Sequence, residues 1–219
     1  MKQQIRFVVT WGCSLSLLMA MSSYRATGQP KPDGAYDGHW WLSIASSERT
    51  GFLNGYFDCY TYEYKGPDRF SSAADTYRNS ITQFYEKGQS FELNGSVADL
   101  LHRFRDPQGR IVIDKYAEHN TGPHGGNDGL YWRQISADAG PEMEQRGFVE
   151  GYLACHTGLD HNKSGTFSKS VEEYVKVITQ WYGFNRATDD INANHEPTAI
   201  ADVLFKFRDQ TQPAKSGDK

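Results

Sequence analysis

The sequence is poor in cysteine and lacks the composition of a membrane or disordered protein. Three cysteines in 219 residues are too few, and the chain is too long, for a miniprotein stapled by disulfide bonds. Charged residues make up 23% and aromatic residues 14%, which excludes a charge-rich disordered chain and a protein with several membrane spans. We therefore expect a folded body of one large domain or two small ones.

The sequence also lacks the motifs of common catalytic, metal and nucleotide sites. It contains no H-x-x-x-H pair, no C-x-x-C pair, no nucleophile elbow, no phosphate-binding loop and no dinucleotide fingerprint. We expect no cofactor, no metal and no enzymatic activity. A paired-carboxylate hydrolase that uses Asp58, Glu63 or Glu150 is a weaker alternative, because acidic residues on helices are usually solvated.

An apolar run at residues 7–21 follows Lys2 and Arg6 and precedes small and polar residues. This order is typical of a secretory signal peptide. The run has 15 positions, several of them Thr, Gly or Ser, and is shorter than the roughly 20 apolar residues of a membrane-spanning helix. We expect residues 1–28 to be a cleaved signal, with cleavage at residues 20–22 as the alternative. The mature protein is then periplasmic or extracellular, with no stable membrane insertion.

No run of lysine and arginine remains after the signal. Its removal takes away three basic residues and no acidic one, so the net charge changes from −4 to −7. No part of the mature chain is then suited to neutralise a phosphate backbone, and nucleic acid is not an expected partner. A basic partner fits this charge better than an acidic one.

The strongest internal signal is a duplication. Three segments recur in the same order at offsets of 96, 97 and 103 residues: 51–59 as 147–155, 77–85 as 174–182, and 97–106 as 200–209. We predict two copies of one unit, residues 37–106 and 128–209, joined by a linker at 107–127. Residues 29–36 are expected to be a flexible start and residues 210–219 a disordered tail.

Apolar residues at three- and four-residue spacings predict three helices in each unit. Only residues 110–113, in the linker, resemble a strand. The predicted fold is all-α, with two pseudo-symmetric three-helix units packed as one globular helical body. Helix starts are predicted at Pro141, at Ser170 with Glu173 as a capping box, near Ser72 with Asp75, and at Pro197.

The first predicted helix of each unit carries small residues at positions i, i+4 and i+8, which lie along one stripe. A glycine inside a helix costs about 1 kcal/mol relative to alanine, so repeated glycines indicate close approach by another element. Either each stripe packs within its own unit, or the two first helices cross at their stripes. The stripes are Gly51, Gly55 and Cys59 in the first copy, and Gly147, Gly151 and Cys155 in the second.

Cys59 and Cys155 are the two cysteines that remain after Cys13 leaves with the signal. They occupy equivalent positions in a chain directed to an oxidising compartment, which favours a disulfide bond over two buried thiols. Crossing helices would bring the Cα atoms within the roughly 4.4 to 6.8 Å that a disulfide needs. The bond would close a loop of almost 100 residues, which is worth about 4 to 5 kcal/mol in the chain-entropy model.

Polar residues present in one copy only are the candidates for function, because those shared by both copies are expected to serve the fold. Besides His119 and His124 in the linker, they form the predicted binding surface: Asp58, Glu63, His156, Asp160 and His161. Residues 160–166 also match the opening of a calcium-binding EF-hand loop. The twelfth position, which should supply a bidentate glutamate, is Val171, so we predict a polar turn and no cation.

These residues resemble a known family in their order along each unit. A Gly-aromatic-aliphatic-x-Gly helix, a Gln near an aromatic-Tyr helix end, and a Pro-x-x-x-Ala-x-x-Leu last helix are similar to the small exported all-helical immunity proteins that neutralise type VI secretion amidase effectors. The matching positions are 51–55 with Asp58, 147–151, Gln83, Gln180, and Pro197 with Ala201 and Leu204. The resemblance implies a non-enzymatic periplasmic binder, with two fused units in place of a homodimer. Members of that family carry intradomain cysteines, whereas each unit here has one.

The sequence thus predicts an exported helical interaction protein, a monomer of two fused repeats and an immunity-like inhibitor of a cell-wall-active effector. The alternative is a protein that binds a small ligand or cell-wall fragment through aromatic residues before each first helix. Those residues are Trp40, Trp41, Tyr131 and Trp132. Because they recur in both copies, they are also suited to cap the bundle.

Overall fold

The computed structural model describes residues 36–64, 70–105, 124–137, 141–159, 167–183 and 195–209. The predicted signal at residues 1–28, residues 29–35 of the predicted flexible start, the predicted tail at 210–219 and the strand-like segment 110–113 lie outside these ranges. Tyr36, the last residue of the predicted start, is buried and belongs to the core. Within the described ranges the secondary structure is helical, apart from two isolated β-bridges. The predicted all-α fold is confirmed.

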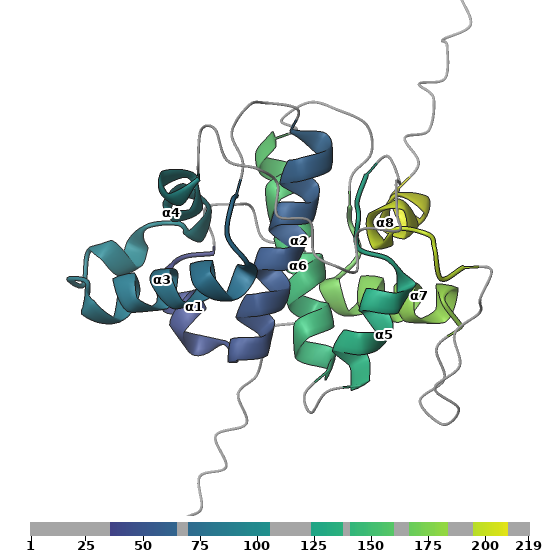
Figure 1. Cartoon of the computed structure of the whole chain (residues 1–219), viewed down its shortest axis with the longest axis horizontal. Coiled ribbons are helices and arrows are strands. Elements are labelled where there is room, and N and C mark those ends of the chain that lie inside the picture. Colours follow the sequence, from purple (N-terminus) through teal and green to yellow (C-terminus); the bar gives the residue numbers. More distant parts are fainter. Residues whose placement is uncertain are drawn as a thin grey trace, which may run out of the picture.

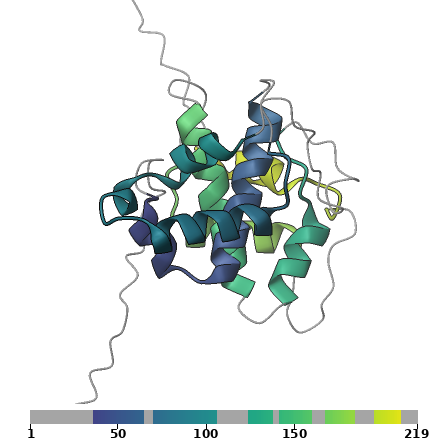
Figure 2. The same ribbon diagram turned by 60° about the vertical axis from the view of Figure 1, so that its left-hand side comes forward.

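Two long helices form the centre of the molecule, and shorter helices flank them. The first half of the chain contains the helices α1 (Gly38–Ser43), α2 (Ser46–Glu63), α3 (Ala74–Lys87), the short 3-10 helix η2 (Glu92–Asn94) and α4 (Val97–Phe104). The second half contains α5 (Gly129–Ala137), α6 (Pro141–Leu159), α7 (Val171–Trp181) and α8 (Ile200–Phe207). The two long central helices are α2 and α6. Helices α2 and α6 lie side by side, with α1, α3 and α4 on one side and α5, α7 and α8 on the other (Figure 1). They stay together at the centre of the second view (Figure 2).

The prediction of three helices in each half is wrong, because α1 and α5 each add one. Both short helices begin with an aspartate cap: Asp37 Oδ1 accepts from Trp40 N at 2.9 Å, and Asp128 Oδ1 accepts from Leu130 N at 3.0 Å. A side chain that caps the first backbone N–H groups stabilises a helix too short to be stable alone.

Each short helix packs against a central helix through a buried tryptophan. The ring of Trp41 meets Phe52 of α2 at 6.4 Å and 82°, and the ring of Trp132 meets Phe148 of α6 at 6.5 Å and 83°. Edge-to-face contacts of this kind are favourable between aromatic rings. The indole N–H groups donate to Thr82 Oγ1 at 3.0 Å and to Thr179 Oγ1 at 3.1 Å, so these shared threonines serve the fold.

The helix starts follow the predicted signals in part. Helix α6 begins at Pro141, and α7 has the predicted capping box between Ser170 and Glu173. Helix α3 begins at Ala74, close to the predicted start near Ser72, but its N-cap is Ala73 and no side chain caps it, so the capping by Ser72 with Asp75 is wrong. Helix α8 begins three residues after Pro197, because its N-cap Ala199 has extended backbone.

Backbone contact between α2 and α6 explains the glycine stripes. A Cβ atom at Gly51 would lie 2.9 Å from Phe148 N, and one at Gly55 would lie 2.8 Å from the carbonyl carbon of Phe148. The reverse contacts are equivalent: a Cβ at Gly147 would lie 2.9 Å from Phe52 N, and one at Gly151 would lie 2.7 Å from the carbonyl carbon of Phe52. The obstacle is backbone in every case. The two helices therefore cross at their stripes, and only glycine fits there.

Candidate functional site

A disulfide bond joins the two halves one helical turn beyond the glycine contacts. Cys59 and Cys155 are bonded, with a Cα–Cα distance of 6.1 Å, and both side chains are buried. The close crossing places their Cα atoms within the range that a disulfide bridge requires. The bond links residues 96 positions apart.

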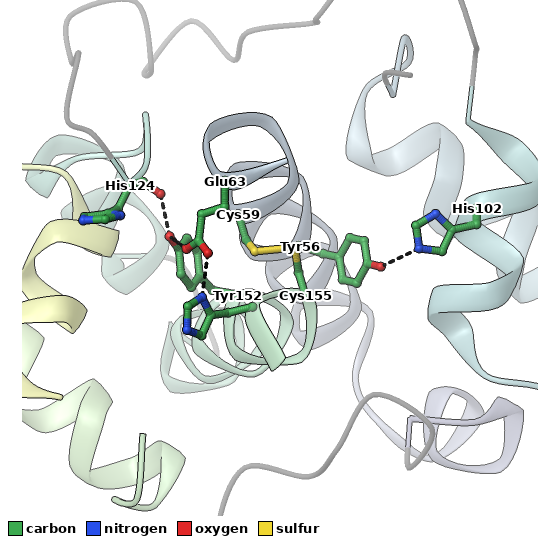
Figure 3. The surroundings of a disulfide bond; sticks show 8 residues. Tyr56, Cys59, Glu63, His102, His124, Tyr152 and Cys155 are labelled. Carbon is green, nitrogen blue, oxygen red and sulfur yellow. Dashed lines mark hydrogen bonds and ion pairs between the residues drawn. A yellow bond between two sulfur atoms is a disulfide. The ribbon is translucent and has the colours of Figure 1, made fainter. Parts of the chain in front are cut away.

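Two tyrosines at equivalent positions flank this disulfide and have different partners (Figure 3). The Tyr56 hydroxyl lies 3.3 Å from His102 Nε2 on α4, within the first half. The Tyr152 hydroxyl lies 2.6 Å from Glu63 Oε1 and 2.6 Å from the carbonyl oxygen of His124. Its single hydrogen serves one of these acceptors at a time. On the Tyr152 side, the contact with Glu63 therefore connects α6 to the end of α2.

Glu63 also contacts His156, the second polar residue present in one copy only. Glu63 Oε2 lies 2.6 Å from His156 Nδ1, and His156 is 6% exposed. The imidazole stands edge-to-face against Phe167 at 5.2 Å and against Phe205 at 5.4 Å. The aromatic rings shield the contact between the imidazole and the carboxylate from water, which strengthens a hydrogen bond of this kind. The pair links α2 to α6 behind aromatic rings.

Asp58 is the third one-copy residue at this end of the crossing, and it is buried. Its Oδ1 accepts from Gly126 N at 2.7 Å, which holds the segment before α5 against α2. Its Oδ2 has no hydrogen-bond partner among the residues that the structure describes. Burial raises the pKa of Asp58 to about 7, and hydrogen bonds from Gly126 and Asn127 only partly oppose this. The carboxyl group is therefore neutral below about pH 7 in the folded protein.

The stability of the protein should depend on the charge of Asp58. Because its folded pKa is about 7, above its ordinary value, the folded state holds a proton that the unfolded chain loses above pH 4. The stability from this group therefore falls as the pH rises from about 4 to 7. Asp58→Asn, neutral at every pH, should gain about 2 to 3 kcal/mol relative to wild type between pH 5 and pH 8 in urea unfolding.

The matched control is Asp75→Asn, at a side chain that is 66% exposed. The free energy of unfolding of this variant should depend on pH in the same way as that of the wild type. Burial also raises the pKa of Glu150 to about 7, so Asp58→Asn removes only part of the decline. A constant difference between Asp58→Asn and wild type from pH 5 to 8 would contradict the assignment.

A second polar cluster, which the sequence analysis missed, surrounds Arg146 at the other end of the crossing. Arg146 forms ion pairs with Glu48 at 3.1 Å, with Glu150 at 2.9 Å and with Glu172. Desolvation is the main cause of the raised pKa of Glu150, against the attraction of Arg146. One guanidinium serves three carboxylates, and a protonated Glu150 lowers the repulsion among them. This cluster connects α2, α6 and α7.

The predicted binding surface is corrected by these positions. Asp58 and His156 are buried, because each is used in contacts that hold α2, α6 and the segment before α5 together. Glu63 lies with them, at a side-chain exposure of 15%. Asp160 and His161, with the calcium-like segment 160–165, lie outside the described residues.

The carboxylates considered for a hydrolase each have different partners. Asp58 binds Gly126, Glu63 contacts His156 and Tyr152, and Glu150 contacts Arg146. The aromatic residues considered for ligand binding are also occupied. Trp41, Tyr131 and Trp132 are buried, and Trp40 packs 5.1 Å from the Phe52 ring. These aromatic residues cap the two central helices.

An open pocket lies instead on the first half, between the end of α3 and the start of α4. Its volume is about 240 Å³, and the lining residues are Phe84, Tyr85, Phe91, Glu92, Gly95, Ser96, Asp99, Leu100 and Arg103. Phe91 is 66% exposed, which is unusual for a large apolar side chain. This pocket was not predicted from the sequence, because its residues come from the end of α3, a turn and α4, and their meeting depends on how the two helices pack.

Comparison with family models, curated proteins and solved structures gave no match to this chain. Among the residues that the structure describes, no group of three His, Cys, Asp or Glu side chains is arranged to hold a metal ion. In the same ranges, no helix combines the length and the apolar character needed to cross a membrane.

Proposed function

We propose that the chain is an exported, non-enzymatic helical binding protein that inhibits a cell-wall-active effector in the manner of an immunity protein. The observation that carries this proposal is that Glu63 and His156 contact each other. These are residue types that catalysis commonly uses, yet they contact each other in the interior and join the two halves. The surface in contrast offers Phe91 beside carboxylates, which suits a binding partner.

Two further features support export and a protein partner. A disulfide between distant residues is typical of proteins that fold in an oxidising compartment. The same bond, with the glycine contacts, holds α2 and α6 together, and a rigid surface loses little entropy on binding. The net charge of −7 after removal of the predicted signal favours a basic partner.

The proposal predicts a specific inhibitory complex. Residues 29–219 are immobilised in the oxidised form and exposed to a periplasmic extract of the source cell. From this extract they should retain a basic protein that degrades peptidoglycan. Added at an equimolar amount, the free chain should abolish that degradation, measured as release of soluble cell-wall fragments. The same chain, reduced and alkylated in urea, is the control and should retain nothing. Repeated capture of no such protein, or of one that stays active in the complex, would overturn the proposal.

A further inference from the structure

The open pocket of the first half is built from rings and charged groups. Phe84 and Tyr85 come from the end of α3, and their rings contact each other at 5.4 Å. Phe91 and Glu92 come from the turn that follows. Helix α4 adds Asp99 and Arg103 at its start and end. The lining therefore has aromatic surface, two carboxylates and one cation.

The second half has an aromatic side chain at the corresponding place, but it is covered. The His195 ring stacks on Trp181 at 4.5 Å with 16° between the planes, and His195 Nδ1 lies 2.6 Å from the carbonyl oxygen of Trp181. The ammonium of Lys206 lies 3.8 Å from the centre of the same ring. The His195 imidazole and the Lys206 ammonium thus both lie against this indole, and the ammonium contact is a cation–π interaction.

Two sets of contacts establish which positions correspond. Tyr85 donates to the Gly95 carbonyl at 3.0 Å, and Tyr182 donates to the Thr198 carbonyl at 2.7 Å. Phe84 therefore takes the place of Trp181, one residue earlier in each helix.

The second set fixes the turn. A Cβ at Gly38 would lie 3.0 Å from the Cα of Leu93, and one at Gly129 would lie 3.1 Å from the Cα of Glu196. Leu93 therefore corresponds to Glu196. Glu92 and His195, the residues immediately before them, correspond as well. Arg103 corresponds to Lys206 at the offset of 103 residues.

We propose that the pocket binds an arginine side chain of a protein partner, whose guanidinium stacks on Phe84 where the imidazole of His195 stacks on Trp181. Glu92, whose Oε2 also accepts from Gln89 N at 2.6 Å, supplies a carboxylate where the second half supplies that imidazole, and Asp99 adds another. The positive charge of Arg103 compensates one of the two carboxylates. One negative charge remains for the guanidinium of the partner. A guanidinium is planar, stacks on aromatic rings and donates two parallel N–H hydrogen bonds to a carboxylate. This assignment rests on the proposed function and defines the chemistry of the partner.

The pocket chemistry is testable without the partner. The probe is N-acetyl-arginine amide, titrated into the ¹⁵N-labelled oxidised protein and followed by backbone amide shifts. We expect shifts at Phe91, Glu92, Gly95 and Ser96, and roughly tenfold weaker binding of the neutral citrulline analogue. The double substitution Glu92→Gln and Asp99→Asn should weaken arginine binding by a similar factor. Glu86→Gln, an exposed change on α3 outside the lining, is the matched control and should have no effect.

Equal binding of the arginine and citrulline probes would overturn the assignment, as would shifts elsewhere or no shifts. Phe91→Ala, at a side chain too exposed to be needed for folding, separates this proposal from the proposed function. If a captured inhibitor target binds Phe91→Ala and the double variant as tightly as wild type, the pocket assignment is wrong and the function stands. If the arginine probe binds as expected but no target is captured, the proposed function fails and the pocket assignment stands.

Discussion

Replacing Gly151 by alanine should lower the free energy of unfolding by about 3 kcal/mol or more. The added Cβ would lie 2.7 Å from the carbonyl carbon of Phe52, and this obstacle is backbone that no rotamer change removes. Helices α2 and α6 must separate, which loosens the most extensive helix–helix contact in the described part of the chain. The gain of about 1 kcal/mol from better helix propensity offsets only part of the cost. Urea unfolding followed by circular dichroism measures the change.

Gly95→Ala is the matched control for this variant. Gly95 lies outside a helix, its φ is −70°, and the nearest atom to an added Cβ is 3.2 Å away. We expect a change within about 0.5 kcal/mol. Gly55→Ala should resemble Gly151→Ala, and the double variant should cost less than the sum because one separation relieves both contacts. An unaltered unfolding midpoint for Gly151→Ala would contradict direct backbone contact.

Removing the disulfide should produce a loss of similar or larger size. The double substitution Cys59→Ala and Cys155→Ala should lower the free energy of unfolding by about 4 to 5 kcal/mol, because the bond restricts an unfolded chain over 96 residues. Adding reductant to the wild type should reproduce this loss, and the double variant should not respond to reductant. Mass spectrometry of the unfolded, unreduced protein gives an independent check. Two alkylated thiols in that sample would contradict the bond.

The helical fold and the central crossing were accessible from the sequence because both depend on spacing along a helix. Gly51 and Gly55 lie one turn apart, and the same spacing recurs at Gly147 and Gly151. Whether the stripes packed within a unit or against each other was not accessible, because spacing gives the face of a helix and not its neighbour. The sequence favoured the disulfide because Cys59 and Cys155 are equivalent, but the closeness of the two cysteines depended on the same unknown neighbour.

Helices α1 and α5 were missed because neither shows an extended three-and-four spacing. The six residues of α1 give too few turns, and α5 begins with the adjacent apolar residues Leu130, Tyr131 and Trp132. A signal did exist: Asp-Gly-x-aromatic-Trp occurs at residues 37–41 and again at 128–132, an offset of 91. The aspartate of each copy is the helix cap, and the tryptophan is the residue that packs on the central helix.

The candidate site was misread because one-copy polar residues were treated as free for function. Asp58 occupies the position of Ala154 in the other copy, and His156 occupies the position of Tyr60. All four positions are buried. At such positions a polar group persists only with partners, here Gly126 for Asp58 and Glu63 for His156. A comparison of the copies identifies these differences but cannot say which lie in the interior.

The crossing of α2 and α6 has a consequence for how the chain folds. Its contacts join segments almost 100 residues apart, so the contact order is high for a helical protein and folding should be slow by the standard of helical bundles. Until the second central helix has formed, the first exposes a stripe of bare backbone together with Phe52 and Leu53. A chain that closes late stays unfolded for longer after synthesis, and the export that we propose requires an unfolded chain for passage through a secretion channel.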